Sequence, residues 1–256
     1  MSNYETLIIE KKDGYAEVVI NRPDVLNAVN LKLVNEMHDA LDRLAADEGV
    51  RGLIFTGSGD KAFVAGADIS ELVQRTANDA LLGINARLFQ KVEDFPWPTI
   101  AAIKGFALGG GCELALAMDI RIGGESTKMG QPEVNLGILP GAGAPHRLTR
   151  TVGTGRAREL IFTGRIIDAK EAHAIGLLNH VYPDAEVLDK ARQMMATMLK
   201  MSSMAVRLSK LALNAAVNTV DRRSQMVEML SQGILFDSPD KKERMTKFLE
   251  RKKAKG

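Results

Sequence analysis

Strand-like and helix-like patterns alternate through the first half of the chain, and this alternation restricts the fold more than any other feature. Short β-type runs over Thr6–Glu10 and Ala16–Ile20 flank the turn Asp13-Gly14, a pattern typical of a β-hairpin. Asn30 stands where it can cap a helix over Leu31–Ala46, whose apolar residues recur on one face. Further strands are expected over residues 52–56, 99–103 and 120–122, and further helices over residues 69–74, 79–93 and 111–118. Together these elements predict an α/β fold with mostly parallel strands.

The second half of the chain is predicted to be mainly helical. After Ala144, one strand is expected near residues 178–181, and the last helices are expected over residues 185–200, 203–218, 221–236 and 239–252. We expect these last helices to find no uncovered sheet against which to bury their apolar faces. The sequence therefore predicts an α/β core over residues 1–183 and a helical region over residues 184–256 that is used for self-association.

The composition limits where such a chain can act. Of its 256 residues, 45% are hydrophobic, which is enough for a sizeable buried core. The single cysteine, Cys112, excludes an internal disulfide and is typical of a reducing compartment, so a cytoplasmic location is expected. No signal peptide is expected, because the start MSNYETLII lacks a basic segment followed by an apolar one.

The distribution of charge argues against membrane and nucleic-acid functions. The longest apolar stretch, Thr99–Ile122, contains four charged residues and is not expected to span a membrane. The net charge is +2 with acids and bases intermixed, which does not indicate a nucleic-acid partner. One exception is the tail over residues 241–255, where eight lysines and arginines accompany two glutamates. This tail is interpreted either as a solvated helix or as a patch that binds phosphates.

The usual metal and cofactor motifs are not recognised. The four histidines lack the spacing of a metal site, and Cys112 has no cysteine partner. Residues 57–62, GSGDKA, match the dinucleotide pattern GxGxxA after a predicted strand. That pattern also needs a helix to begin there, whereas a second small-residue turn follows, so we interpret the match as coincidental.

Two turns of small residues each precede a predicted helix. In the first, Ala65-Gly66-Ala67-Asp68, the aspartate can cap the helix, and Glu71 can complete a capping box. The second comprises the three glycines of residues 109–111. Each turn can be a purely structural cap, but each also offers free backbone N–H groups to a ligand. Two converging N–H donors are what an oxyanion hole needs.

Two carboxylates accompany these turns. Glu113 follows the triple glycine on a short apolar helix, and Glu133 follows a proline in a segment rich in glycine. Glu113 can instead form a buried ion pair with Lys104 or Arg121, and Glu133 can be an exposed loop acid. If their surroundings separate their pKa values, the two carboxyl groups can divide the roles of acid and base.

Five blocks of the sequence resemble the crotonase superfamily, the enoyl-CoA hydratase/isomerase family, and are most similar to the hydratases. The blocks are NRPDVLNA (21–28), KAFVAGADI (61–69), IAAIKGFALGGGCELALAMDIRI (100–122), GQPEVNLGILPGAG (130–143) and RLTRTVG (147–153). They occur in order and span almost the whole chain. The resemblance implies a spiral of ββα units with a C-terminal helical region that builds homotrimers, often paired into homohexamers.

The same resemblance implies an acyl-CoA thioester substrate and roles for individual residues. The backbone N–H groups of Ala67 and Gly110 match the oxyanion hole, Glu113 and Glu133 match the two catalytic carboxylates, and Gly141 matches a glycine beside the second. The positions that match CoA contacts are Leu26, Ala65, Gly66, Ala67, Asp68, Ile69 and Ser70, and the C-terminal region is expected to complete the CoA site.

The activity implied is that of an enoyl-CoA hydratase, which adds water reversibly to a 2-trans-enoyl-CoA and forms a 3-hydroxyacyl-CoA. No cofactor is expected, because the thioester itself acidifies the α-carbon and coenzyme A is part of the substrate. The alternatives are a Δ3,Δ2-enoyl-CoA isomerase that uses Glu133 alone and a non-catalytic acyl-CoA-binding protein. Ala144-Pro145-His146 departs from the Gly-Thr-Gln usual in hydratases, which bears on the acyl pocket and on the surroundings of Glu133.

Overall fold

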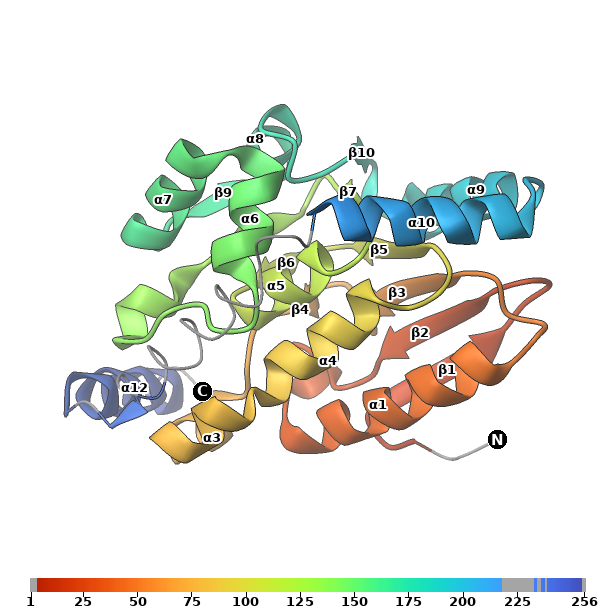
Figure 1. The fold of residues 1–256 in the computed structure, drawn as a ribbon. Helices are drawn as coiled ribbons and strands as arrows, with labels where there is room; N and C mark the ends of the chain where they lie inside the picture. The colour runs from red at the N-terminus through yellow and green to blue at the C-terminus, as the bar shows by residue number, and fades with distance from the viewer. Residues whose placement is uncertain (1–3, 218–232, 234–235, 238, 255–256) are drawn as a thin grey trace.

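Two β-sheets form the framework of the molecule (Figure 1). The computed structural model describes residues 4–217, 233, 236–237 and 239–254. The first sheet has the strand order β1-β2-β3-β5-β7-β10, and the second has the order β4-β6-β8-β9. The strands are β1 (Leu7–Lys11), β2 (Ala16–Ile20), β3 (Leu53–Gly57), β4 (Ala62–Val64), β5 (Thr99–Ile103), β6 (Phe106–Leu108), β7 (Ile120–Gly124), β8 (Lys128–Gly130), β9 (Ile166–Asp168) and β10 (His180–Tyr182).

From β3 to β8, successive strands alternate between the two sheets. Strands β3, β5 and β7 join the first sheet, and β4, β6 and β8 join the second, all with parallel pairing. Helices follow the pairs β3–β4 and β5–β6, so the chain repeats a ββα unit and winds as a spiral. The expected hairpin is also confirmed, because β1 pairs antiparallel with β2 and Leu7 lies opposite Ile20.

Helices cover both faces of the first sheet. The helices within the described residues are α1 (Leu31–Ala46), α2 (Ile69–Leu72), α3 (Ala77–Leu82), α4 (Ile84–Glu93), α5 (Gly110–Leu116), α6 (Ala144–Val152), α7 (Thr154–Thr163), α8 (Ala169–Ala174), α9 (Val187–Leu199), α10 (Ser203–Val217) and α12 (Pro239–Lys253), with short 3-10 helices η1 (Pro23–Val25), η2 (Pro132–Leu136) and η3 (Asp184–Glu186). The predicted cap of α1 is confirmed, because the Asn30 side chain accepts a hydrogen bond from the Leu33 N–H. Helices α1 and α4 lie side by side on one face (Figure 1).

Helix α9 corrects the expectation that the last helices have no sheet to cover. Its residues Val187, Ala191 and Met195 are buried against Ile54 and Ile100 of the first sheet. Side chains alternate along a strand, so Ile54 faces α9 while its neighbour Phe55 faces the core beneath α1 and α4. The division of the chain after residue 183 stays a prediction, and the helix expected over residues 221–236 lies almost wholly outside the described residues.

Two other expectations about local structure are wrong. The single helix expected over residues 79–93 is two helices, because Gly83 adopts a left-handed conformation with φ of 59° and ends α3. None of the four strands of the second sheet was expected, and β9 is an example. It has only three residues and is held by antiparallel pairing with β8, which is distant in sequence.

The basic tail forms helix α12, and not all of its charges are solvated. Lys241 is fully buried, and its ammonium group donates hydrogen bonds to the backbone carbonyls of Arg75 and Phe236. Lys242, Lys247, Arg251 and Lys253 are exposed. No helix within the described part of the chain has the length and apolar character needed to cross a membrane.

Candidate active site

Three turns meet at one edge of the second sheet. Residues 65–68 follow β4, residues 109–110 follow β6 and residues 131–133 follow β8. These three strands are neighbours and run parallel, so their carboxyl ends lie at the same edge. The topology therefore brings together turns that are up to about seventy residues apart in sequence.

The first turn presents the backbone N–H of Ala67. The N–H groups on either side are held, because the Ala65 N–H donates to the Leu26 carbonyl and the Asp68 N–H donates to the Val29 carbonyl. Within the described chain, the Ala67 N–H itself donates to no protein acceptor. Asp68 caps α2 as predicted, by accepting from the Ser70 N–H.

The capping box expected at this turn is wrong. The Glu71 carboxylate accepts a hydrogen bond from the Leu31 N–H, at the start of α1, instead of reaching back to the first turn of its own helix. Asp68 is held further by an ion pair with Arg22, at 3.1 Å. The turn is thus fixed by contacts with the segment around residues 22–31, which sequence spacing within one helix does not reveal.

The second turn places Gly110 beside Ala67. A Cβ atom on Gly110 would lie 3.6 Å from the Ala67 nitrogen, so the two backbones are close neighbours. Gly110 is the first residue of α5, and within the described chain its N–H has no protein acceptor. Both residues line a cavity of about 370 Å³. N–H groups placed in this way can donate to one ligand oxygen.

Glu113 is buried at the inner side of this cavity, with only 3% of its surface exposed. Its Oε1 atom accepts hydrogen bonds from the N–H groups of Ala142, at 2.8 Å, and Ala144, at 3.0 Å. The two residues considered as ion-pair partners of Glu113 bind other groups. Lys104 pairs with Asp60, and the Arg121 guanidinium donates to two backbone carbonyls.

Glu133 lies in η2, is partly exposed and lines the same cavity. Desolvation by its surroundings, and secondly the charge of Glu113, raise the pKa of Glu133 well above its usual value of 4.5. A carboxyl group that keeps its proton in this way can act as a general acid. For Glu133, the surroundings therefore shift the pKa of the carboxyl group upward, in the direction that the role of an acid requires.

Sequence reasoning missed Gln131, which is fully buried beside Glu133. With its amide oriented to donate, the Gln131 nitrogen lies 3.2 Å from each carboxylate oxygen of Glu133. Its position two residues before Glu133 and immediately after β8 was the available signal. Gly109, on the other side, is so close that a Cβ there would lie 2.8 Å from the Glu133 Oε1 atom.

The cavity gathers most, but not all, of the predicted site residues. Those that line it are Ala65, Gly66, Ala67, Ile69, Gly110, Glu113, Glu133 and Gly141. Leu26, Asp68 and Ser70 do not line it, although Leu26 and Asp68 contact or belong to the first turn. Much of the remaining wall is apolar, with contributions from Leu72, Ala80, Ile138, Leu139, Phe236 and Phe248.

The segment Ala144-Pro145-His146 forms the first turn of α6. Proline fits there because the first N–H groups of a helix have no intrahelical acceptor. The departure from the family pattern therefore leaves the helix intact, and the Ala144 N–H remains available to Glu113. The dinucleotide-like segment 57–62 leads into strand β4 rather than a helix, which agrees with its interpretation as coincidental.

Comparisons with known proteins agree with the family resemblance of the sequence blocks. A model of the family described as enoyl-CoA hydratase/isomerase matches residues 10–255. A crotonyl-CoA hydratase of Syntrophomonas wolfei is 44% identical over 98% of this chain and 97% of its own length. A short-chain-enoyl-CoA hydratase of Clostridium acetobutylicum is 42% identical, with coverage of 98% and 97%.

A solved structure gives the same result for the fold. The crystal structure of an enoyl-CoA hydratase from Mycobacterium avium subsp. paratuberculosis matches with a TM-score of 0.87 and 30% identity, over 97% of both chains. The family model and the relatives each cover nearly the whole sequence. The chain belongs to the enoyl-CoA hydratase/isomerase family.

Proposed function

We propose that this protein is an enoyl-CoA hydratase, which adds water reversibly across the double bond of a 2-trans-enoyl-CoA and forms a 3-hydroxyacyl-CoA. One observation carries the proposal: the carboxyl groups of Glu113 and Glu133 and the N–H groups of Ala67 and Gly110 all border one largely apolar cavity. The names of the relatives at 44% and 42% identity support the same activity.

In the proposed mechanism, the thioester oxygen accepts hydrogen bonds from Ala67 and Gly110. Negative charge grows on this oxygen as the bond to C3 forms, and two donors already in place stabilise it. The thioester itself acidifies C2, so the reaction needs neither a metal nor a redox cofactor. Substrate contacts are proposed for Ala65, Gly66 and Ile69, which line the cavity, and for Leu26, Asp68 and Ser70 behind it.

The two carboxyl groups are proposed to act on different atoms. Glu113 orients a water molecule and accepts one of its protons as the oxygen attacks C3. Glu133 delivers its proton to C2, a role supported by the raised pKa of its carboxyl group. Each turnover leaves one proton on Glu113 and removes one from Glu133, so the pair must re-equilibrate with solvent.

Two variants test this assignment with crotonyl-CoA as substrate. Glu133→Gln should lower hydration by about 10²-fold or more, and should also abolish solvent exchange of the C2 proton on butyryl-CoA. Glu113→Gln should lower hydration similarly but leave that exchange largely intact, because Glu133 and both N–H donors remain.

The possible outcomes separate the alternatives. Circular dichroism should show that both variants are folded. If Glu113→Gln hydrates crotonyl-CoA at the parental rate, Glu113 is structural and the isomerase alternative is favoured. If the parent protein turns over no member of a panel of enoyl-CoA thioesters, a non-catalytic acyl-CoA-binding protein is favoured.

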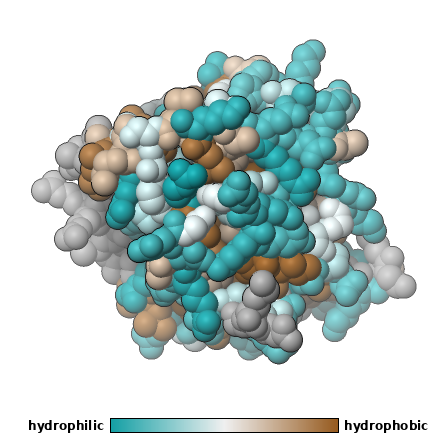
Figure 2. Space-filling model, turned by 90° about the vertical axis from the view of Figure 1, so that its right-hand side faces the viewer, coloured by the Kyte–Doolittle hydropathy of each residue, from teal (hydrophilic) through white to brown (hydrophobic). Residues whose placement is uncertain are grey.

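We further propose that the protein assembles as a homotrimer or homohexamer and acts in the cytoplasm. Helix α10 leaves Met204, Leu208, Leu211 and Leu213 more than half exposed, which supports a contact between copies. The end of the molecule at which α9 and α10 lie is otherwise mostly hydrophilic, with scattered apolar patches (Figure 2). A buried Cys112 as the single cysteine is consistent with a reducing compartment. Light scattering at micromolar concentration that yields the mass of a monomer would contradict the assembly.

A further inference from the structure

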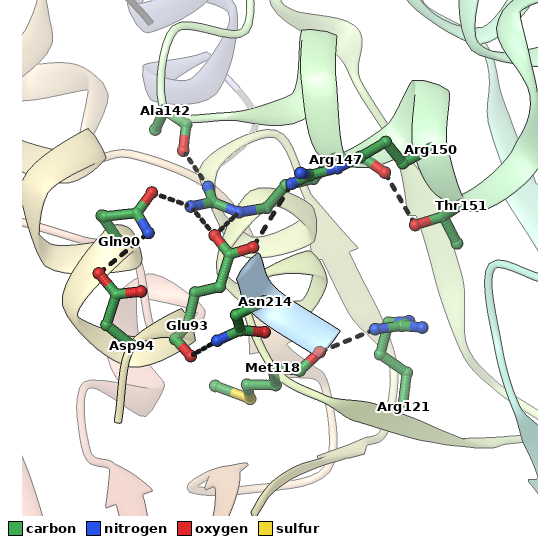
Figure 3. A network of polar contacts seen from close by, with 10 residues as sticks. All are labelled: Gln90, Glu93, Asp94, Met118, Arg121, Ala142, Arg147, Arg150, Thr151 and Asn214. Carbon is green, nitrogen blue, oxygen red and sulfur yellow. Dashed lines mark hydrogen bonds and ion pairs between the residues drawn. The ribbon is translucent and has the colours of Figure 1, made fainter. Parts of the chain in front are cut away.

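A buried arginine lies behind the loop that holds Glu113. The Arg147 side chain, on α6, is only 3% exposed and stands at the centre of a polar network (Figure 3). Its Nε and Nη2 atoms donate to the Glu93 Oε2 atom at 2.8 Å and 2.5 Å, and Nη2 also donates to Gln90. Glu93 compensates the charge of the arginine, as burial of a cation requires.

The remaining side-chain contact of Arg147 leads to the active site. Its Nη1 atom donates to the Ala142 carbonyl at 3.1 Å, and the N–H of that same residue donates to the Glu113 Oε1 atom at 2.8 Å. Ala142 is thus held from one side by the arginine and holds the carboxylate on the other. No side-chain contact between Arg147 and Glu113 is needed for the two to be coupled.

Arg147 also packs directly against the loop of residues 142–144. Gly143 adopts a φ of +123°, and a Cβ there would lie 1.9 Å from the Arg147 Nη1 atom. The arginine therefore packs against the bare Cα of Gly143, between the two residues whose N–H groups bind Glu113. The backbone N–H of Arg147 also donates to the Gly143 carbonyl, at 2.9 Å.

We propose that Arg147, with Glu93 as its counter-ion, is a positioning residue for Glu113. It fixes residues 142–144 so that the carboxyl group is held where it can orient water. This inference rests on the proposed function, in which Glu113 activates water and Glu133 transfers the C2 proton. Glu133 lies on η2, outside this network, so the effect of Arg147 should be confined to the hydration step.

The test is Arg147→Lys, assayed for hydration of crotonyl-CoA and for C2-proton exchange on butyryl-CoA. Lysine keeps the positive charge but cannot place N–H groups on both Glu93 and the Ala142 carbonyl in the fixed geometry of a guanidinium. We expect kcat for hydration to fall about tenfold to a hundredfold, as small misplacements of catalytic groups do, with KM changed little. C2-proton exchange should stay within about twofold of the parent, since a positioning effect confined to Glu113 leaves its rate intact.

A double-mutant cycle with Glu113→Gln tests whether the arginine acts through that residue. Groups that act as one unit are non-additive, so Arg147→Lys should cause no further loss when Glu113 is already glutamine. Glu93→Gln provides a second variant that disturbs the same arginine, and it should show the same separation of hydration from exchange.

Two control variants match the chemistry of the substitution. Arg150→Lys alters the other arginine that contacts Glu93, at 3.4 Å, and has no hydrogen bond to Ala142. Arg192→Lys disturbs a different pair, with the buried Glu17 beneath α9. Both should hydrate crotonyl-CoA within about twofold of the parent, because within the described chain no hydrogen bond joins either arginine to the Ala142 carbonyl.

The outcomes distinguish this inference from the proposed function. If Arg147→Lys hydrates at the parental rate, or lowers hydration and exchange equally, the inference is wrong. A further loss in the Glu113→Gln background would also overturn it, because the arginine would then act by another route. If Glu113→Gln itself retains parental hydration, the proposed roles fail first and the inference fails with them.

Discussion

Substituting alanine for Gly110 should separate catalysis from stability. The added Cβ would lie 3.6 Å from the Ala67 nitrogen and 3.8 Å from the Gly66 carbonyl carbon, which are ordinary van der Waals distances. Gly110 begins helix α5 and does not have a positive φ. The fold should therefore accept the methyl group, and the free energy of unfolding should be unchanged or rise by up to about 1 kcal/mol, because alanine restricts the unfolded chain.

Activity should change in the opposite direction. The thioester oxygen must lie about 2.7–3.1 Å from the N–H donors of Ala67 and Gly110 to be stabilised. A methyl group in contact with the Ala67 nitrogen competes with that oxygen for the same space. Loss of one such donor typically lowers kcat by about 10²–10³-fold, or roughly 3–4 kcal/mol in the activation free energy.

Gly111→Ala is the matched control for this experiment. Its Cβ would lie 1.9 Å from the Val64 backbone oxygen, so the helix or strand β4 must shift, and both stability and activity should fall. Hydration of crotonyl-CoA and urea unfolding should be measured for both variants. If Gly110→Ala hydrates within about threefold of the parent, the assignment of the oxyanion hole is wrong. If it loses as much stability as Gly111→Ala, the fold itself needs Gly110 and the packing argument is wrong.

Two further predictions concern charge. Because the pKa of Glu133 is raised in the folded chain, the folded state retains a proton that the unfolded state releases above about pH 4.5. As pH rises past this value, the free energy of unfolding of the parent should therefore fall relative to that of Glu133→Gln. The fall should be at most about 1.4 kcal/mol per pH unit and should end once the pH passes the pKa of Glu133 in the folded chain. Urea unfolding at several pH values measures this difference, and parallel curves would contradict it. Charge reversal at the exposed Arg251 and Lys253 should raise KM for crotonyl-CoA a few-fold, which is roughly what two exposed charges contribute. It should also weaken the dependence of KM on salt. An unchanged KM would mean that these exposed charges of the tail are only solvated.

The elements that were predicted correctly are determined by residues that lie close together in the sequence. Helix α1 begins and ends where expected, because the residues of its cap and of its apolar face all lie within 17 consecutive positions, 30–46. The short strand β9 is the opposite case, since its three residues form a strand only by pairing with β8. The break between α3 and α4 at Gly83 has a local signal, but an ambiguous one. A single glycine inside a helical pattern is compatible either with a continuous helix or with a helix that ends at a glycine in the left-handed conformation.

The site was predictable as a set of residues but not as an arrangement of atoms. Two turns of small residues and two carboxylates were recognised from sequence, and the structure brings them to one cavity because their strands are parallel neighbours. The hydrogen-bond partners of Glu113 were not predicted. They are backbone N–H groups 29 and 31 residues away, and every residue type except proline supplies a backbone N–H, so side-chain identity gives almost no signal.

The three glycines of residues 109–111 illustrate how one sequence signal can have three physical causes. Gly109 has a positive φ of +52° and leaves room for the Glu133 carboxylate, whereas Gly111 leaves room for the backbone of β4. Gly110 is required by neither, since a Cβ there meets only ordinary contacts within the protein. Gly110 carries one of two neighbouring N–H groups that donate to no protein acceptor in the described chain, and the other belongs to Ala67. The proposed function accounts for a glycine here by the close approach of the substrate. The entropy that glycine loses on folding is thus accepted at Gly109 and Gly111 for structure and, in the proposed function, at Gly110 for the substrate.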